Sequence, residues 1–115
     1  GREAADVRTP ESSFERRWAM GVLQSAMERL ACRYREEGKG AMFEVLQPCL
    51  FGEGGASLHA ETAAKLGMNA NTLRVAVHRL RRRYREMLRA TVADTVSDPS
   101  EIDEEIRFLI SCIEG

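Results

Sequence analysis

One segment near the middle of the chain, residues 57–89, most constrains the fold. Apolar residues recur in its second half at steps of three and four: Leu73, Val77, Leu80, Tyr84 and Met87. This spacing matches an α-helix with one buried face and does not match a β-strand, whose side chains alternate at every second residue. The spacing therefore predicts a long amphipathic helix over residues 70–95.

The residues before this helix predict a shorter helix and a tight turn. The shorter helix should span residues 58–66, with Ser57 as its N-cap. Gly67 can adopt the positive φ that ends a helix sharply. Asn69 is placed to cap the long helix. Two helices joined in this way predict a helix-turn-helix, whose second helix is the recognition helix.

The predicted recognition helix is strongly basic. Residues 65–89 hold eight Lys or Arg and one Glu, a net charge of +7, although the whole chain has a formal net charge of −1. Residues 90–115 hold seven acids and one Arg, a net charge of −6. Positive charge concentrated on one helix is typical of a surface that binds DNA.

The remaining segments are also expected to be helical. A helix over residues 12–37 should begin at a capping box, Ser12 to Glu15. A second helix should cover residues 40–50 and end or be distorted at Pro48. A last helix should begin at an Asp98 cap. We therefore predict an all-α fold, a four- to five-helix bundle that contains a helix-turn-helix with a long basic recognition helix and an acidic C-terminal helix.

Apolar stripes predict which faces of the first and last helices are buried. The first stripe consists of Phe14, Trp18, Leu23, Met27, Leu30 and Tyr34. The last stripe consists of Ile102, Ile106, Leu109, Ile110 and Ile113. We expect residues 1–11 to be a flexible segment, residues 12–96 to be one domain with the helix-turn-helix at 57–89, and residues 97–115 to be a helical extension.

The helical period also predicts which side chains face DNA. Opposite the apolar face lie Asn71, Val75, His78 and Arg82, flanked by Arg74 and Arg79. Near the start of a recognition helix, Arg can bind guanine, Asn can bind adenine and an apolar side chain can touch a thymine methyl group. Further along, the arginines are better placed to contact phosphates; these are Arg81, Arg82, Arg83, Arg85 and Arg89. A solvated face, or pairing with the acidic tail, is the alternative.

Residues 60–88, AETAAKLGMNANTLRVAVHRLRRRYREML, resemble the C-terminal promoter-recognition region of bacterial sigma factors of the extracytoplasmic-function type. The shared pattern is a helix ending in Ala-x-x-Leu-Gly, followed by Thr72 and an Arg-rich helix. The resemblance implies binding of the promoter −35 element and of the β-subunit flap of RNA polymerase. It places the family's readers on Arg74, Val75, His78 and Arg79, with Thr72 at the start of the helix.

The chain also departs from the family pattern, both within this region and outside it. Val75 and Ala76 replace the polar or basic residues usual in that family. The aromatic-rich region with which the family melts the −10 element has no counterpart. The chain is therefore expected to be either a fragment of a sigma factor or a stand-alone sigma-like regulator. The tail, residues 97–113, is an extension reminiscent of sigma-like proteins of planctomycete-type bacteria.

Other functions remain as alternatives. One is an independent helix-turn-helix regulator that dimerises on a palindromic site. Another is an interaction module that binds polymerase or an anti-sigma factor and binds DNA weakly. The acids of residues 98–105 could stabilise a helix N-terminus or compete with DNA for the basic helix. The apolar stripe of the same helix could be a dimer or partner surface.

Several classes of function lack a sequence signal. We find no glycine-rich phosphate loop, HExxH motif or nucleophile elbow, so we expect neither an enzyme nor a cofactor. The three cysteines form no CxxC pair, which indicates free, buried thiols in a reducing cytoplasm and no metal site. No apolar run approaches the ~18 residues of a membrane span.

Overall fold

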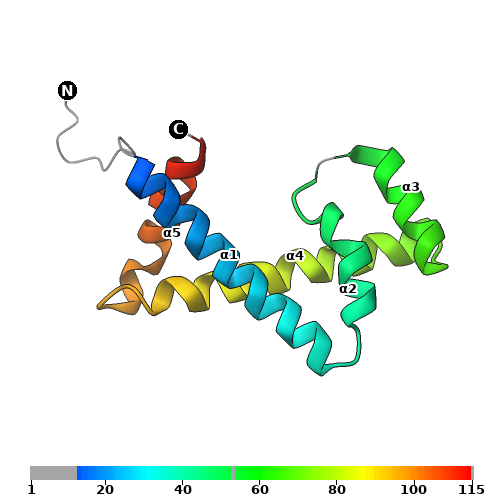
Figure 1. Cartoon of the computed structure of the whole chain (residues 1–115), viewed down its shortest axis with the longest axis horizontal. Helices are drawn as coiled ribbons and strands as arrows, with labels where there is room; N and C mark the ends of the chain where they lie inside the picture. Colours follow the sequence, from blue (N-terminus) through cyan, green and yellow to red (C-terminus); the bar gives the residue numbers. More distant parts are fainter. Residues whose placement is uncertain (1–12, 53, 115) are drawn as a thin grey trace. The chain divides into compact units, whose positions relative to one another are not determined.

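In the computed structural model, which describes residues 13–52 and 54–114, every regular element is helical (Figure 1). The prediction of an all-α fold is confirmed for these residues. The helices are α1 (Ser13–Glu36), α2 (Gly40–Leu46), the 3-10 turn η1 (Gln47–Cys49), α3 (Gly55–Leu66), α4 (Ala70–Ala93), the 3-10 turn η2 (Pro99–Glu101) and α5 (Ile102–Glu114). The flexible segment predicted for residues 1–11 and the Ser12 cap lie outside the described residues.

The chain divides into two compact units. The central unit comprises Glu28–Glu86, and the terminal unit comprises the chain up to Met27 and from Met87 onward. The central unit thus contains α2, α3, the second part of α1 and most of α4. The terminal unit contains the first part of α1, the end of α4 and α5.

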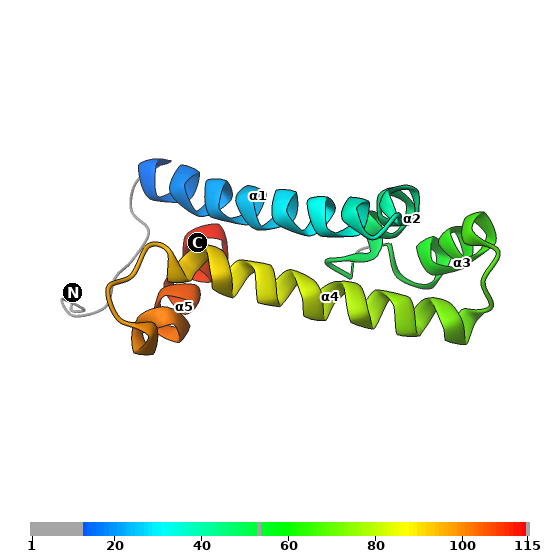
Figure 2. The same cartoon turned by 90° about the horizontal axis from the view of Figure 1, so that it is seen from below.

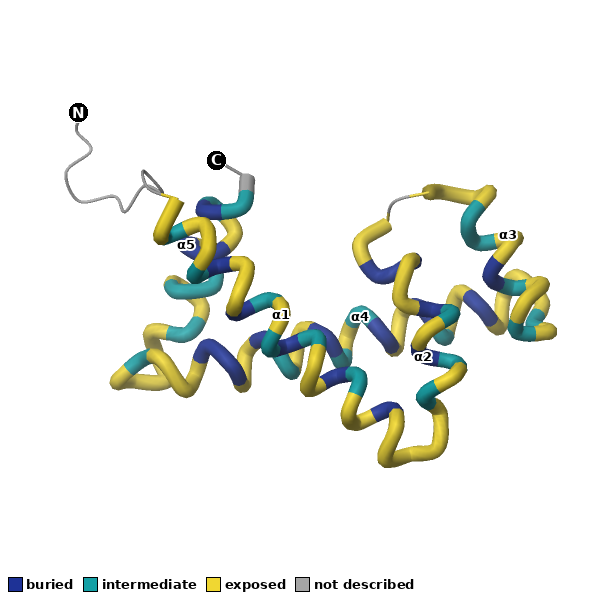
Figure 3. Tube along the Cα trace, in the orientation of Figure 1, coloured by how far each residue is buried: buried dark blue, intermediate teal, exposed yellow. Residues whose placement is uncertain are grey.

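The apolar core of the central unit draws on α1, α2 and α4. Leu30 and Tyr34 of α1, Leu46 of α2 and Leu80 of α4 are at most 1% exposed. Tyr34 also stacks on Phe43, with ring centroids 5.3 Å apart. Figure 3 shows buried positions recurring along the helices between exposed ones. This alternation is what an amphipathic helix produces when one face packs inward.

One glycine and one proline set where α1 and α2 end. Gly38, at φ 77°, ends α1 with hydrogen bonds from Gly38 N–H to Arg35 O and from Lys39 N–H to Tyr34 O, a Schellman motif. Pro48 lies in η1, so α2 ends at Leu46, and the predicted distortion is confirmed.

The prediction that α3 begins with a Ser57 cap is wrong. The helix begins at Gly55, and its N-cap is Gly54 at φ 86°, with no side-chain cap hydrogen bond. A Cβ atom on Gly54 would lie 2.7 Å from the Leu58 Cβ atom. The left-handed conformation and this close approach both require glycine, and they start the helix earlier than a serine cap would.

In the terminal unit, α5 packs against α1, as both views show (Figures 1 and 2). The rings of Trp18 and Phe108 lie 6.0 Å apart, and Arg16 donates a hydrogen bond to Ile113 O at 3.0 Å. Asp98 accepts a hydrogen bond from Ser100 N–H at 3.0 Å, which confirms the predicted cap. The η2 turn then precedes α5.

The apolar stripes of the terminal unit differ in part from the prediction. Phe14 is 70% exposed and Ile110 is 44% exposed, so both were wrongly assigned to buried faces. The buried positions of α1 in this unit are Ala19, Val22 and Ala26. The sequence pattern favoured large side chains, but the packed face of α1 here uses small residues, which allow closer approach of a neighbouring helix.

Candidate nucleic-acid interface

The turn between α3 and α4 sets the start of the basic helix. Gly67 adopts φ 66°, and hydrogen bonds run from Gly67 N–H to Ala64 O and from Met68 N–H to Ala63 O, a complete Schellman motif. Asn69 Oδ1 then accepts the Thr72 N–H at 2.8 Å. Both predicted devices, the glycine C-cap and the asparagine N-cap, are confirmed. Together they fix where α4 begins relative to α3.

Within the central unit, α4 buries one face and exposes the other. Leu73, Val77 and Leu80 are at most 2% exposed, and Tyr84 is 6% exposed. Burial raises the pKa of the Tyr84 hydroxyl to about 12. Eight of the predicted DNA-facing residues are exposed: Asn71, Thr72, Arg74, Val75, His78, Arg79, Arg82 and Arg85. We call these eight residues the reading face.

The first turns of the reading face combine polar, charged and apolar groups. Arg74 Nη1 donates a hydrogen bond to Asn71 Oδ1 at 2.9 Å, one helical turn earlier. Val75 is 52% exposed although it is apolar. An exposed valine beside a guanidinium and a side-chain amide offers three different kinds of contact at the start of one helix.

Arg81 is engaged inside the central unit instead of facing solvent. Its Nε donates to Leu50 O at 3.0 Å, and its Nη2 donates to Cys49 O at 3.0 Å. These carbonyls belong to the last residue of η1 and to the residue after it, so the guanidinium ties α4 to the chain after α2. The sequence grouped Arg81 with the phosphate contacts, but in the structure this side chain already has backbone partners.

Arg83 is engaged in the same unit by Glu37 and Tyr34. Its Nη1 donates to Glu37 Oε1 at 3.0 Å, and a second hydrogen bond joins the other nitrogen and oxygen. The guanidinium carbon also lies 4.9 Å from the centroid of the Tyr34 ring. The hydrogen bond from Arg83 lowers the pKa of the Glu37 carboxyl. We therefore place Arg83, like Arg81, outside the reading face.

The acidic helix makes its described ion pair in the terminal unit, with the end of α4. Arg89 donates to the Asp103 carboxylate in the first turn of α5, and this hydrogen bond lowers the pKa of Asp103. Both side chains are at least half exposed. A pair this exposed contributes little to stability. Arg89, a predicted phosphate contact, thus has an acidic partner.

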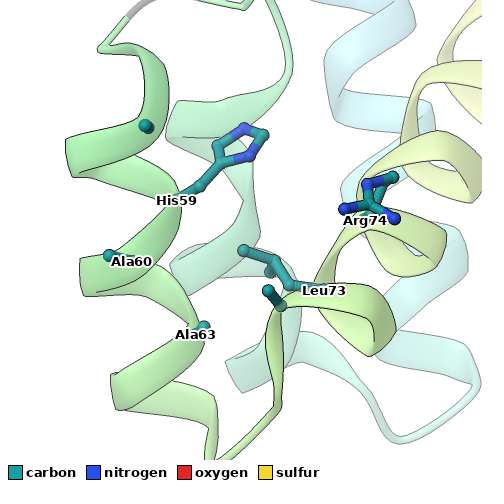
Figure 4. Close-up of a pocket in the computed structure, with 7 residues that line it drawn as sticks. His59, Ala60, Ala63, Leu73 and Arg74 are labelled. Atoms are coloured by element: carbon teal, nitrogen blue, oxygen red, sulfur yellow. The ribbon is translucent and has the colours of Figure 1, made fainter.

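A hollow of about 270 Å³ opens between α3 and α4. Its walls are apolar and include Ala60 and Ala63 of α3 and Ala70 and Leu73 of α4. Of the described residues in its lining, His59 and Arg74 have ionisable side chains. In Figure 4 the His59 ring extends from α3 towards the space between the helices, while Arg74 stands on α4.

His59 is the residue at this surface that sequence reasoning missed. The sequence shows alanines at three- and four-residue steps around it, at Ala56, Ala60 and Ala63. That spacing indicates one face of α3, but it does not show that this face meets α4 at Arg74.

Other kinds of site are not seen in the described residues. Between residues 13 and 114, leaving out residue 53, no group of His, Cys, Asp and Glu side chains is arranged to hold a metal ion. Over the same residues no helix has the length and apolar character needed to cross a membrane. The cysteines there are free; Cys49 and Cys112 are buried, as predicted, whereas Cys32 is exposed.

No family model, no curated protein and no solved structure matches this chain in the three comparisons made.

Proposed function

We propose that the central unit is a helix-turn-helix module that binds DNA in a sequence-dependent manner during transcription initiation. In this proposal α3 and α4 are the two helices of the motif, and α4 enters the major groove. The proposed target is a promoter −35 element, read as part of a sigma factor associated with RNA polymerase.

The observation that carries the proposal is the reading face itself. Four arginines, Arg74, Arg79, Arg82 and Arg85, are exposed along one side of a helix whose opposite side is buried. The helix starts directly after a glycine turn and an asparagine cap. The major groove of DNA admits one α-helix, and the N-terminal residues of that helix reach the base edges.

The reading face divides into two parts with different expected roles. Asn71, Arg74, Val75, His78 and Arg79 lie in the first turns, where base contacts are expected. Arg82 and Arg85 lie further along and are assigned to phosphates. Thr72 has its backbone N–H bound to the Asn69 cap, so we assign only its side chain to the interface.

The test is fluorescence anisotropy of the chain against a pool of duplexes, some of which carry −35-like GGAAC-type elements. We expect preferential binding of some duplexes, and loss of that preference in the double variant Arg74→Ala/Arg79→Ala. The matched control is Arg33→Ala/Arg35→Ala, which removes the same charge from exposed positions of α1 in the same unit. If both variants weaken binding to all duplexes equally, non-specific electrostatic attraction accounts for the binding and the proposal fails.

The polymerase partner in this proposal rests on the resemblance of residues 60–88 to sigma factors. It is tested separately, by measuring binding of the chain to the isolated β-subunit flap. An anti-sigma factor is tested as a second partner in the same format. If the chain binds either protein but shows no preference among the duplexes, an interaction module is favoured over a promoter reader.

A further inference from the structure

We infer that the hollow between α3 and α4 receives one sugar–phosphate unit of the DNA backbone, held between His59 and Arg74. This inference rests on the proposed function and adds to it a contact residue, His59, outside the reading face. It also gives α3 a direct part in binding, in addition to its role in positioning α4.

The hollow is continuous with the reading face. Arg74 belongs both to the reading face and to the lining of the hollow, so a ligand on α4 at this position also meets α3. In helix-turn-helix complexes, the first helix crosses the DNA backbone while the second lies in the groove. The hollow is therefore where the backbone passes if α4 is seated in the major groove.

A second feature is the chemistry of the lining. Arg74 provides a guanidinium, which suits phosphate oxygens, and the imidazole of His59 provides at least one N–H donor in any protonation state. The alanines between them, Ala60 and Ala63 on α3 and Ala70 on α4, have no side chain beyond Cβ. Small apolar walls below two nitrogen donors match a deoxyribose ring with its phosphate.

A third feature is the charge of the lining. Among the described residues, the lining of the hollow contains no carboxylate, so an anion placed there meets no repulsion from these side chains. Arg74 has one hydrogen bond, to Asn71 Oδ1. A guanidinium has five N–H donors, so Arg74 can bind a phosphate with some of them and keep others for the base contact assigned to it above. His59 is half-buried, so part of it remains open to a ligand in the hollow.

The experiment combines protein variants with single neutral phosphates in the DNA. The probe is the tightest-binding duplex of the pool, synthesised with one methylphosphonate at each backbone position in turn. We expect one position at which the neutral linkage weakens DNA binding by the wild-type chain about tenfold. His59→Leu should weaken binding to the unmodified duplex by a similar factor and show little further loss at that position.

Two further variants keep the result interpretable. His59→Gln retains an N–H donor and should keep most of the affinity. Lys65→Gln removes a cation from the same helix outside the hollow and should remain sensitive to the same methylphosphonate. Thermal unfolding of each variant shows whether the fold is intact.

The possible failures are distinct. If wild type prefers a duplex but His59→Leu binds it equally well, the inference is overturned and the proposed function stands. The inference is likewise overturned if His59→Leu and the methylphosphonate weaken binding independently, because then they do not act on one contact. If wild type shows no duplex preference at all, the proposed function fails, and the inference fails with it.

Discussion

Arg81 and Arg82 are neighbours in sequence and identical in chemistry, yet the structure predicts opposite effects for their replacement. Arg82 is exposed on the reading face. Arg81 is partly buried, and its guanidinium binds the carbonyls of Cys49 and Leu50. We therefore predict that Arg82→Gln weakens DNA binding at unchanged stability, and that Arg81→Gln lowers stability with little direct effect on DNA contacts.

The magnitudes follow from the contacts. Each phosphate neutralised on duplex DNA contributes about −0.9 to the slope of log affinity against log salt. Arg82 and Arg85, the two reading-face arginines assigned to phosphates, therefore contribute about −1.8 to the slope, whereas counting Arg81 and Arg83 as well would give about −3.6. Arg82→Gln should reduce the steepness by about 0.9 and weaken binding about fivefold near 0.15 M salt.

The stability effect of Arg81→Gln is estimated separately. A hydrogen bond from a charged donor contributes about 1.5–3 kcal/mol. Because this guanidinium is only partly buried, we expect the variant to lose about 2 kcal/mol of unfolding free energy in total. Arg82→Gln should change the unfolding free energy by less than about 0.5 kcal/mol, as surface substitutions usually do.

The assay is anisotropy between roughly 0.05 and 0.2 M salt, together with urea unfolding of the same two variants. The reasoning is refuted if Arg81→Gln reduces the salt slope as much as Arg82→Gln and leaves the unfolding free energy unchanged. That result would mean that Arg81 leaves the Cys49 and Leu50 carbonyls to contact phosphates.

Three further predictions concern the turn and the core of the central unit. Asn69→Ala removes the cap of α4 and should lower the unfolding free energy by about 1 kcal/mol. Asn69→Asp keeps a capping oxygen and should retain most of that stability; chemical denaturation of the two variants measures the difference. Gly67→Ala places a side chain at φ 66° and should cost about 1 kcal/mol, seen as a lower melting temperature; no loss would contradict the left-handed conformation. Burial raises the pKa of the Tyr84 hydroxyl from 10.0 to about 12, so as the pH rises the hydroxyl ionises in the unfolded chain before it ionises in the folded one. The unfolding free energy should therefore be unchanged below pH ~10 and should fall by about 2–3 kcal/mol as the pH rises to ~12. Tyr84→Phe should abolish that part of the alkaline loss, which urea titrations at several pH values would measure.

Much of the local structure could be predicted from the sequence because its causes are local. Gly67 and Asn69 act through backbone groups within a few residues, so their roles could be recognised without knowledge of the fold. The helical period likewise predicted that Leu73 and Leu80 are buried while Arg82 is exposed. A strict spacing on one continuous helix determines which residues share a face.

The tertiary structure decided features that the helical period of the sequence could not predict. Arg81 lies beside Arg82 in the sequence, and only the position of the Cys49 and Leu50 carbonyls shows that the Arg81 guanidinium is engaged, whereas Arg82 is exposed. Phe14 matches the apolar period of α1, but the buried positions there are alanines and a valine. His59 had no sequence signal that linked it to Arg74. These properties depend on which surfaces from distant parts of the chain meet, and periodicity along one helix carries no information about its neighbours.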